Sequence, residues 1–501
     1  MDVLYQLGLG FNVALDPLNL VLCFIGVLFG TLVGVLPGLG PAASVSLLLP
    51  MTFKMTPVGG IIMLAGILYG AQYGGSTTSI LVNMPGEATS VVTCFDGYQM
   101  AKQGRAGPAL GIAAFASFIA GTLSLVGLTL VAPPLVRMAL EFGPPEYFSL
   151  TLLGMLMLIY LSRGPIIKAL MMGAFGFLLS SIGQEVFTGT LRFTMGIFEL
   201  YDGVGLVGVV MGLFGISEVL INLETRLVKQ EVVGEKITSV LPSLQDWILS
   251  IWAIVRGTII GFFLGSLPGG GMVLSTFASY AVEKKVSKHP EKFGTGAIEG
   301  VAGPEAANNA AVQATFIPLL TLGIPPNATL AIMMGALMIH NIIPGPLLMA
   351  EHPDVFWGIV SSMYIGNAML LILNLPLIGI WVKVLKVPYS ILFPVILLVC
   401  LIGAYSINGS LVDMVIMVLF SVIGYLMKKF KYEMAPVVLG MILGGIMEPA
   451  LRRSLIISNG SFTIFLSRPI SLALMIGVAI LLVSPLILRV MGKRRRGLGE
   501  R

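Results

Sequence analysis

Charged side chains are rare in this chain. They make up 11% of its 501 residues, whereas hydrophobic residues make up 56%. Soluble proteins have about a quarter of their residues charged, so this composition excludes an ordinary soluble fold. Stretches such as Pro17–Phe53 and Gly257–Val282 carry no charge at all, and about 20 apolar residues suffice to cross a bilayer. We predict an all-α, multi-pass membrane protein with about 12 transmembrane segments.

Cysteine and enzyme signatures are also scarce. Cys23, Cys94 and Cys400 show no CxxC spacing, which argues against a disulfide framework or a metal cluster. Neither HExxH nor GxSxG occurs, so we do not expect an enzyme or a bound cofactor. The first twenty residues contain no Lys or Arg, so no secretory signal is predicted. The basic C-terminal residues are interpreted as a cytoplasmic tail, without a nucleic-acid partner.

Glycine and proline are abundant, with 61 and 29 copies, and their positions repeat. The motif LPGLG at 36–40 recurs as LPGGG at 267–271, and NMPGEAT at 83–89 is matched by GIPPNAT at 323–329. Repeated halves are common in secondary transporters. The predicted organisation is a first membrane repeat (1–222), a polar, cytoplasmic linker (223–247), a second membrane repeat (248–451), and a C-terminal helix with a basic tail (452–501).

The charge pattern predicts that the two repeats are inverted. KKFK at 428–431 indicates a cytoplasmic loop, whereas its counterpart at 183–202 has a single basic residue and indicates an external one. The lysine-rich stretch 282–292 and the linker are both cytoplasmic by this rule, so the segment centred on LPGGG is expected to be re-entrant. Arg452 and Arg453 would lie on the external side in this arrangement, and the charge pattern does not explain two basic residues there.

The Pro-Gly motifs should break the membrane helices. A helix that restarts after such a turn presents unpaired N–H groups, and Pro41 suits its first position. Two such tips, one from each repeat, could converge near the midplane and hold a carboxylate without a buried arginine. The alternative is that the glycines which precede the turns, at four-residue spacing from 26 and from 257, only allow close helix packing.

Polar residues cluster beside the predicted breaks. Neutral oxygen and amide groups there suit a carboxylate together with a hard cation such as Na+. The predicted substrate-binding residues are Pro37, Gly38, Gly40, Ser76, Thr77, Thr78, Asn83, Pro85, Gly86, Gly269, Gly270, Gly271, Asn308, Asn309, Pro325, Pro326, Asn327 and Thr329. The candidates for coupling to Na+ or H+ are Glu87, Asp96 and Glu305, which could equally lie in interfacial loops.

Three long blocks then indicate a family: GVLPGLGPAASVSLLLP (34–50), YGAQYGGSTTSILVNMPGEATSVVTCFDGYQMAKQGRAGPALG (69–111) and GPEAANNAAVQATFIPLLTLGIPPNATLAIMMGAL (303–337). With them the chain resembles the large membrane subunit of the bacterial tripartite tricarboxylate transporter family. The resemblance implies a permease of the bacterial inner (cytoplasmic) membrane that works with a small membrane subunit and a periplasmic solute-binding protein. It also implies ion-gradient-driven uptake of citrate and other carboxylates.

Two other functions stay open at this point. The permease of an ATP-driven importer would need a cytosolic helix that couples it to an ATPase, and only the linker or the segment 283–300 could supply one. A passive channel would not need two matched, polar, broken segments.

Overall fold

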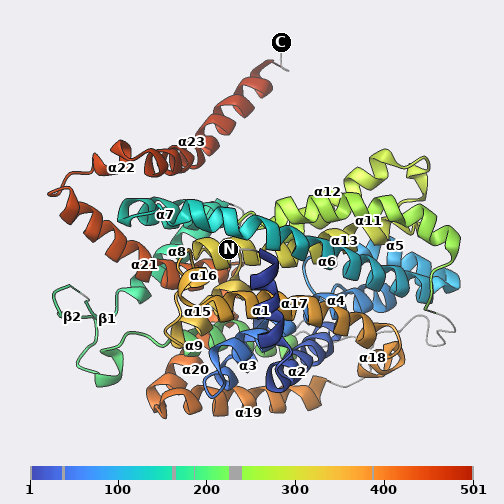
Figure 1. Cartoon of the computed structure of the whole chain (residues 1–501), viewed down its shortest axis with the longest axis horizontal. Coiled ribbons are helices and arrows are strands. Elements are labelled where there is room, and N and C mark those ends of the chain that lie inside the picture. Colours follow the sequence, from blue (N-terminus) through green and yellow to red (C-terminus); the bar gives the residue numbers. More distant parts are fainter. Residues whose placement is uncertain are drawn as a thin grey trace. The chain divides into compact units, whose positions relative to one another are not determined.

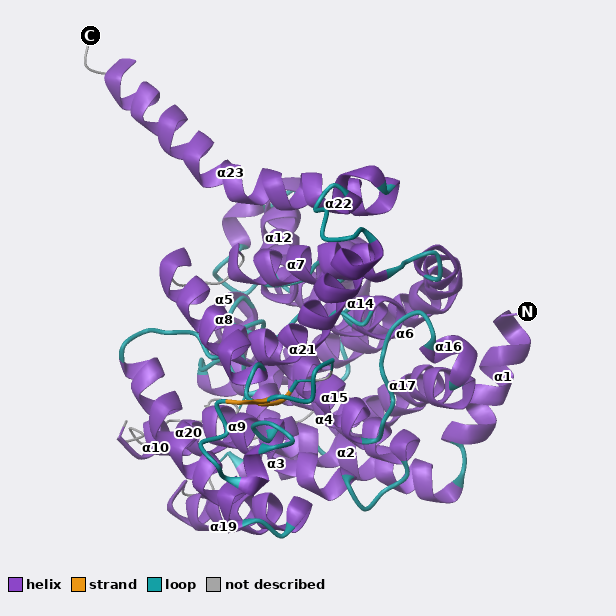
Figure 2. Ribbon diagram, turned by 90° about the vertical axis from the view of Figure 1, so that its left-hand side faces the viewer, coloured by secondary structure: helices purple, strands orange, loops and turns teal. Residues whose placement is uncertain are grey.

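The computed structural model describes residues 3–36, 40–160, 165–185, 187–224, 240–385 and 389–498, and nearly all of them are helical (Figure 2). Within these ranges, 8 helices are long and apolar enough to cross a membrane. The expected all-α membrane protein is therefore confirmed, and the count of about 12 segments stays a prediction. Pro37 and Gly38 lie outside the described residues, as does most of the linker.

The chain forms two compact units, and each takes residues from both sequence halves (Figure 1). Unit 1 comprises residues 1–139 and 205–430. Its elements are α1 (Val3–Ala14), α2 (Pro17–Val35), α3 (Pro41–Thr52), α4 (Pro57–Val82), α5 (Thr93–Met100), the π-helical turn η1 (Ala101–Arg105), α6 (Ala106–Ala139), α9 (Leu206–Val210), the π-helical turn η3 (Met211–Ile216), α10 (Ser217–Glu224), α11 (Leu244–Gly265), α12 (Gly271–Val286), the 3-10 turn η4 (Pro290–Lys292), α13 (Glu299–Ala314), α14 (Phe316–Leu322), α15 (Ala328–Ile339), α16 (Leu348–Glu351), α17 (Pro353–Asn374), α18 (Ile378–Val384), α19 (Tyr389–Asn408) and α20 (Leu411–Lys429).

Unit 2 comprises residues 140–204 and 431–501. Its elements are α7 (Pro144–Tyr160), α8 (Ile166–Ser180), the strands β1 (Gly183–Gln184) and β2 (Leu191–Arg192), the 3-10 turn η2 (Phe198–Leu200), α21 (Ala435–Ile457), α22 (Ile464–Ser467) and α23 (Pro469–Leu498). The two strands form a short antiparallel hairpin in which Gly183 pairs with Arg192.

The repeated glycines are helix-packing positions. A Cβ atom on Gly30 of α2 would lie 2.4 Å from the carbonyl oxygen of Ile67 in α4, and one on Gly261 of α11 would lie 2.3 Å from that of Ala307 in α13. No larger residue fits at such a distance, so glycine allows these helix pairs to touch backbone to backbone. The glycines one turn away behave alike: Gly26, Gly34, Gly257 and Gly265.

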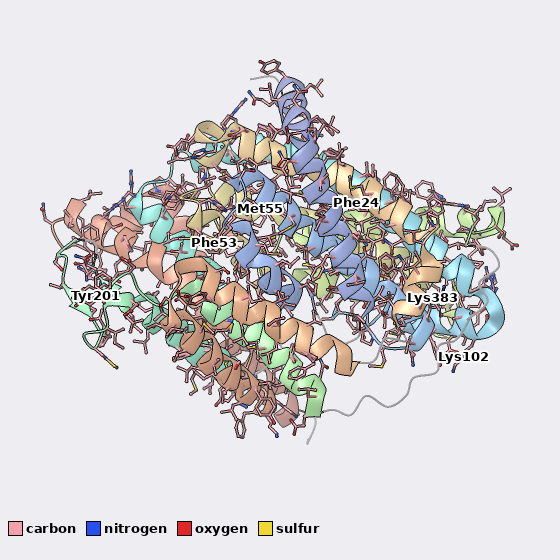
Figure 3. The ribbon with its side chains drawn as sticks, turned by 90° about the horizontal axis from the view of Figure 1, so that it is seen from below. Phe24, Phe53, Met55, Lys102, Tyr201 and Lys383 are labelled. Carbon is pink, nitrogen blue, oxygen red and sulfur yellow. The ribbon has the colours of Figure 1, made fainter. Side chains whose placement is uncertain are left out.

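These two contacts also agree with the sequence repeat. Gly30 and Gly261 are 231 residues apart, and their partners Ile67 and Ala307 are 240 apart, which is also the spacing of NMPGEAT and GIPPNAT. The outer face of α2 carries exposed side chains such as Phe24 (Figure 3). The close-packing interpretation of the upstream glycines is therefore confirmed.

The helices break at both Pro-Gly motifs, as expected. In the first half α2 ends at Val35, and α3 begins at Pro41 with Gly40 as its N-cap. In the second half α11 ends at Gly265 and the chain turns back into α12 at Gly271. The two arms of this second hairpin are joined by Arg256, whose Nε and Nη2 lie 2.8 and 2.6 Å from the carboxylate oxygens of Glu283.

Glycine contacts also join helices of different sequence halves within each unit. In unit 2, a Cβ on Gly440 of α21 would lie 2.3 Å from the carbonyl oxygen of Gly173 in α8. In unit 1, a Cβ on Gly212 of η3 would lie 2.5 Å from the carbonyl oxygen of Met417 in α20. The last helical segment of the first half, which contains η3, thus packs against α20 of the second half. The last helix of the second repeat, α21, packs against α8 of the first half.

The α2–α4 contact gives a direct test. Gly30→Ala should destabilise the protein by about 1–3 kcal/mol, because the added methyl group overlaps a backbone carbonyl that cannot move alone. Thermal unfolding in detergent would measure the change. The matched control is Gly8→Ala in α1, where a Cβ meets nothing within 4 Å and the change should be neutral or stabilising. Equal melting temperatures for the two variants would contradict the packing role.

Candidate functional site

A buried carboxylate, Glu305, lies at the centre of unit 1. It comes from α13 and is 1% exposed. Three hydroxyl groups from three other segments donate to it: Ser76 of α4 at 2.7 Å, Ser117 of α6 at 3.5 Å, and Thr93 at the start of α5. All three donors are neutral, so they satisfy the carboxylate's hydrogen-bonding capacity without neutralising its charge.

A second carboxylate, Glu87, lies in the loop after α4 and directly follows the Pro85–Gly86 break. The side-chain amide of Asn308 in α13 donates to its Oε1 at 3.2 Å, and the Thr89 hydroxyl also donates to it. This loop approaches α4 very closely, because a Cβ on Gly86 would lie 2.5 Å from the Cα of Gly75. Glycine at both positions therefore places Glu87 against α4 and α13.

Several amide oxygens beside these carboxylates have no partner. Among the described residues, Asn308 Oδ1, Asn309 Oδ1 and Gln313 Oε1 are buried acceptors on α13 without a hydrogen-bond donor. The amide nitrogen of Asn309 donates to Ser117 at 2.6 Å, which leaves its oxygen free. A buried polar atom without a partner is costly, so these oxygens are suited to a cation, a water molecule or a hydroxyl group of a ligand.

A small cavity adjoins Glu305. It is lined on the polar side by Tyr73, Ser76, Ser117 and Asn374, and on the apolar side by residues of α6 such as Ala113. Thr77, which was predicted as a binding residue, also lines it. The cavity and the two carboxylates form one polar cluster inside the otherwise apolar unit.

No basic side chain neutralises this cluster within the described parts of the chain. The printed partners of Glu87 and Glu305 are hydroxyl and amide groups only. Two carboxylates in a buried site repel one another and are expensive to ionise together. The cluster can therefore bind a cation or take up a proton, and it cannot hold an anion unaided.

In each half, a described residue at or just before the first Pro-Gly motif lies against the second break. Gly86 lies against the carbonyl oxygen of Gly34 near the end of α2, and the Gly269 amide donates to the Pro326 carbonyl at 2.8 Å. The joint anion site stays a prediction, because Pro37 and Gly38 of the first tip lie outside the described residues.

Asp96 makes hydrogen bonds that hold separate segments of the chain together. Its carboxylate is fully buried and accepts hydrogen bonds at 2.8 Å from the backbone amides of Gly294, Gly296 and Ala297, and at 2.9 Å from the Tyr280 hydroxyl. The backbone donors belong to the loop that leads into α13. Asp96 therefore ties α5, which begins with Thr93, to the helix that carries Glu305.

Other predicted binding residues have local structural contacts. Asn327 caps α15 by accepting from the Leu330 amide at 3.0 Å, and the Thr78 hydroxyl donates to the Val35 carbonyl at 2.8 Å. Asn83 is the exposed C-cap of α4 in a left-handed conformation. The rest lie at the turns already described or next to them: Gly40, Pro85, Gly270, Gly271, Pro325 and Thr329. Their role in substrate binding stays a prediction.

Four residues of the cluster were not predicted. Gln72 accepts from Thr89 at 3.0 Å, Tyr73 lines the cavity, and Thr93 and Ser117 donate to Glu305. Gln72 and Tyr73 lie one turn before the predicted Ser76, so the helical period could have identified them. Ser117 lies in a long apolar helix, where a single serine usually bonds its own backbone, and no local signal marks it.

The role of Asp96 can be tested by removing its carboxylate. Asp96→Ala should destabilise the protein by about 3 kcal/mol or more, because three buried amides lose their acceptor. Thermal unfolding would measure this, with the exposed Asp354→Ala as the control. Equal melting temperatures for Asp96→Ala and the wild type would contradict the structural role.

The comparisons with known proteins agree with the resemblance inferred from the sequence motifs. Residues 20–439 match the "Tripartite tricarboxylate transporter TctA family". The chain is 50% identical over 485 residues to the "Uncharacterized 52.8 kDa protein in TAR-I ttuC' 3'region" of Agrobacterium vitis, covering 97% of this chain and 96% of that protein.

A second Agrobacterium vitis protein, the "Uncharacterized protein in TAR-II ttuC' 3'region", is 53% identical over 215 residues, which are 43% of this chain and 89% of that protein. No solved structure matches the chain. The match to the family covers most of the chain, including all the residues of the polar cluster. The chain therefore belongs to the TctA family, the large membrane subunits of tripartite tricarboxylate transporters.

Proposed function

We propose that this chain is the permease of an ion-gradient-driven importer of tricarboxylates or related carboxylates. The observation that carries the proposal is the buried cluster around Glu87 and Glu305. The hydrogen-bond partners of the two carboxylates are neutral groups, and the helix of Glu305 also carries three buried amide oxygens without a partner among the described residues. A carboxylate substrate brings further negative charge to such a site. It can bind there only together with cations or protons, and this shared binding is the physical basis of symport.

Glu305 is the best candidate for the coupling residue. It is the more deeply buried of the two carboxylates, and its three hydroxyl partners come from three different segments. A proton or Na+ on Glu305 would remove the cost of a buried charge and would change how these segments are held together. The bound ion would thereby lower the net negative charge of the site and change the arrangement of the segments around Glu305.

We further propose that the two halves are an inverted duplication. The α2–α4 and α11–α13 pairs share glycine contacts at matching positions, and the last helices of both halves pack against the opposite half in the same manner. Such pseudo-two-fold architecture is typical of secondary transporters. The re-entrant form of the segment centred on LPGGG is part of this proposal, and the Arg256–Glu283 pair supports it because it joins the two arms of the hairpin.

The partners and location follow from the family. The permease would work in the bacterial inner membrane with a small membrane subunit and a periplasmic solute-binding protein that supplies the substrate. The ATP-driven and passive alternatives are less well supported, because neither accounts for a buried acidic cluster that needs a counter-ion.

Reconstitution would test the coupling. Proteoliposomes that contain both membrane subunits should take up labelled citrate when the binding protein is present and a Na+ or H+ gradient is imposed, and uptake should stop when that gradient is collapsed. Citrate is the first probe, and other di- and tricarboxylates follow it. Uptake that persists without any gradient, or that requires ATP, would exclude the symporter.

The second test concerns Glu305. Glu305→Gln keeps the shape and loses the charge, so gradient-driven uptake should fall by about tenfold or more while substrate exchange across the membrane persists. The control is Glu299→Gln in the first turn of the same helix, which lies outside the cluster. Wild-type uptake and ion dependence in Glu305→Gln would remove this residue from the coupling mechanism.

A further inference from the structure

Unit 2 carries an apolar surface that no described residue covers. It is the segment 187–198, which runs from the β1–β2 loop through β2 to the start of η2 and is called the hairpin tip below. This segment contains a single charged residue, Arg192. The side chains of Phe193, Met195 and Phe198 are 65%, 90% and 78% exposed. Leaving such large apolar groups in water is unfavourable, so the hairpin tip requires an apolar environment.

The backbone holds these side chains outward. Phe193 and Met195 both have left-handed conformations, with φ of 53° and 50°. This region is unfavourable for bulky residues, and the residue between them, Thr194, is buried. The conformation thus turns Phe193 and Met195 away from the unit instead of letting them pack against it.

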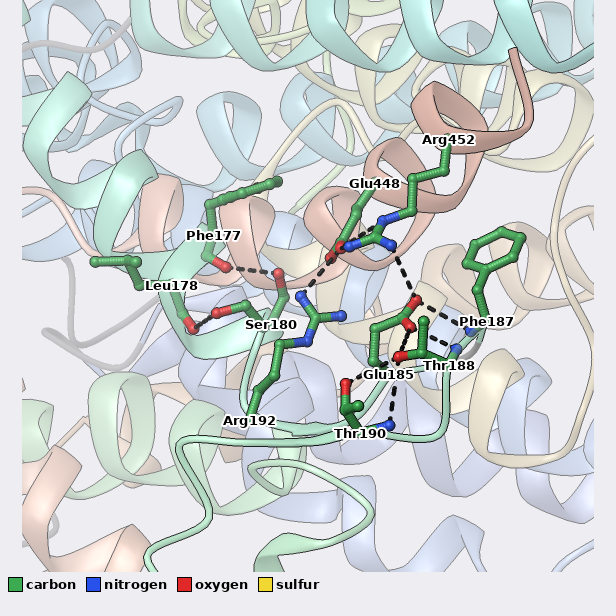
Figure 4. A network of polar contacts seen from close by, with 11 residues as sticks. Phe177, Leu178, Ser180, Glu185, Phe187, Thr188, Thr190, Arg192, Glu448 and Arg452 are labelled. Carbon is green, nitrogen blue, oxygen red and sulfur yellow. Dashed lines mark hydrogen bonds and ion pairs between the residues drawn. The ribbon is translucent and has the colours of Figure 1, made fainter. Parts of the chain in front are cut away.

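A network of ion pairs fixes the base of the hairpin (Figure 4). Arg192 and Arg452 both contact Glu448, with nitrogen to oxygen distances of 3.0 Å. Arg452 also lies 3.5 Å from Glu185. These contacts account for Arg452, which the charge pattern left unexplained, because Glu448 and Glu185 neutralise the two arginines.

Glu185 remains charged at all physiological pH values. The hydroxyl of Thr188, together with neighbouring backbone amides and Arg452, lowers the pKa of Glu185 to about 2. Its ionised form is therefore retained until the pH falls well below neutral. The hairpin is consequently held at a fixed place on unit 2.

That place lies beside the C-terminal ends of two apolar helices. Glu448 and Arg452 belong to the last turns of α21, a helix apolar enough to span a bilayer, and α8 ends three residues before the hairpin begins. Other exposed apolar residues follow the network at the end of α21, namely Ile456, Ile457 and Phe462. Aromatic and aliphatic side chains at this level are typical of the membrane interface.

From this geometry we infer that the hairpin tip inserts into the interfacial layer of the lipid bilayer and anchors unit 2 there. Exposed apolar residues line α8 up to Leu178, shortly before the hairpin, and Ile456 and Ile457 are exposed at the end of α21, which favours lipid over a protein partner as the occupant of the tip. The paired arginines add no net charge at the base, so the tip enters the layer through its apolar side chains. The anchor is independent of the transport chemistry proposed for unit 1.

Site-directed fluorescence tests the inference on the complete chain in bilayers. Met195→Cys is labelled with an environment-sensitive fluorophore, and a nitroxide attached to the lipid near the headgroup serves as the quencher. The three native cysteines are buried, so the unmodified chain gives the labelling background. The matched control is Lys288→Cys in the exposed, polar loop that follows α12.

We expect quenching at least about threefold stronger at position 195 than at position 288. Equal quenching at the two positions would overturn the inference. Protection of position 195 that appears only after the small membrane subunit or the binding protein is added would also overturn it, and would identify a protein surface instead. Because Met195 is almost fully exposed, its replacement should leave the fold intact.

Discussion

The structure depends on direct backbone contact between glycine-bearing helices. In lipid there is little hydrophobic drive for helices to associate, so close van der Waals contact has to supply it. Gly30 against Ile67 and Gly261 against Ala307 bring α2 onto α4 and α11 onto α13. The glycines of α2 and α11 occupy one face each of α4 and α13, so the other faces of α4 and α13 are free to carry polar residues. Ser76 of α4 and Glu305 and Asn308 of α13, which belong to the buried cluster, lie on these helices.

The cluster shows how a membrane protein can handle an anion without a buried base. Neutral hydroxyl and amide groups surround Glu305 and Glu87. Under the proposed symport, the ion and the substrate would neutralise each other in this site, and electrostatics would make transport depend on the ion. Asp96 differs from the other two acidic residues because three backbone amides of one loop and the Tyr280 hydroxyl donate to its carboxylate.

The two units use charge differently. Unit 1 keeps its acidic residues buried in a cluster without cations, whereas unit 2 pairs Glu185 and Glu448 with arginines at the end of a helix. In the first case the missing counter-charge suits a transported ion. In the second the pairing fixes a hairpin whose apolar side chains face outward. The sign and position of neighbouring charges therefore distinguish the proposed transport site in unit 1 from the proposed anchor in unit 2.

The sequence alone determined the fold class, the helix breaks and the family. Composition, charge-free lengths and Pro-Gly motifs act locally and are independent of distant contacts. It also indicated Ser76, Asn308 and Glu305 through their position beside the breaks. Only the tertiary structure decided which groups meet. Ser117 and Thr93 reach Glu305 from distant segments, and Asp96 is bound by a loop about 200 residues away. Such pairings depend on helix crossings that no local pattern encodes.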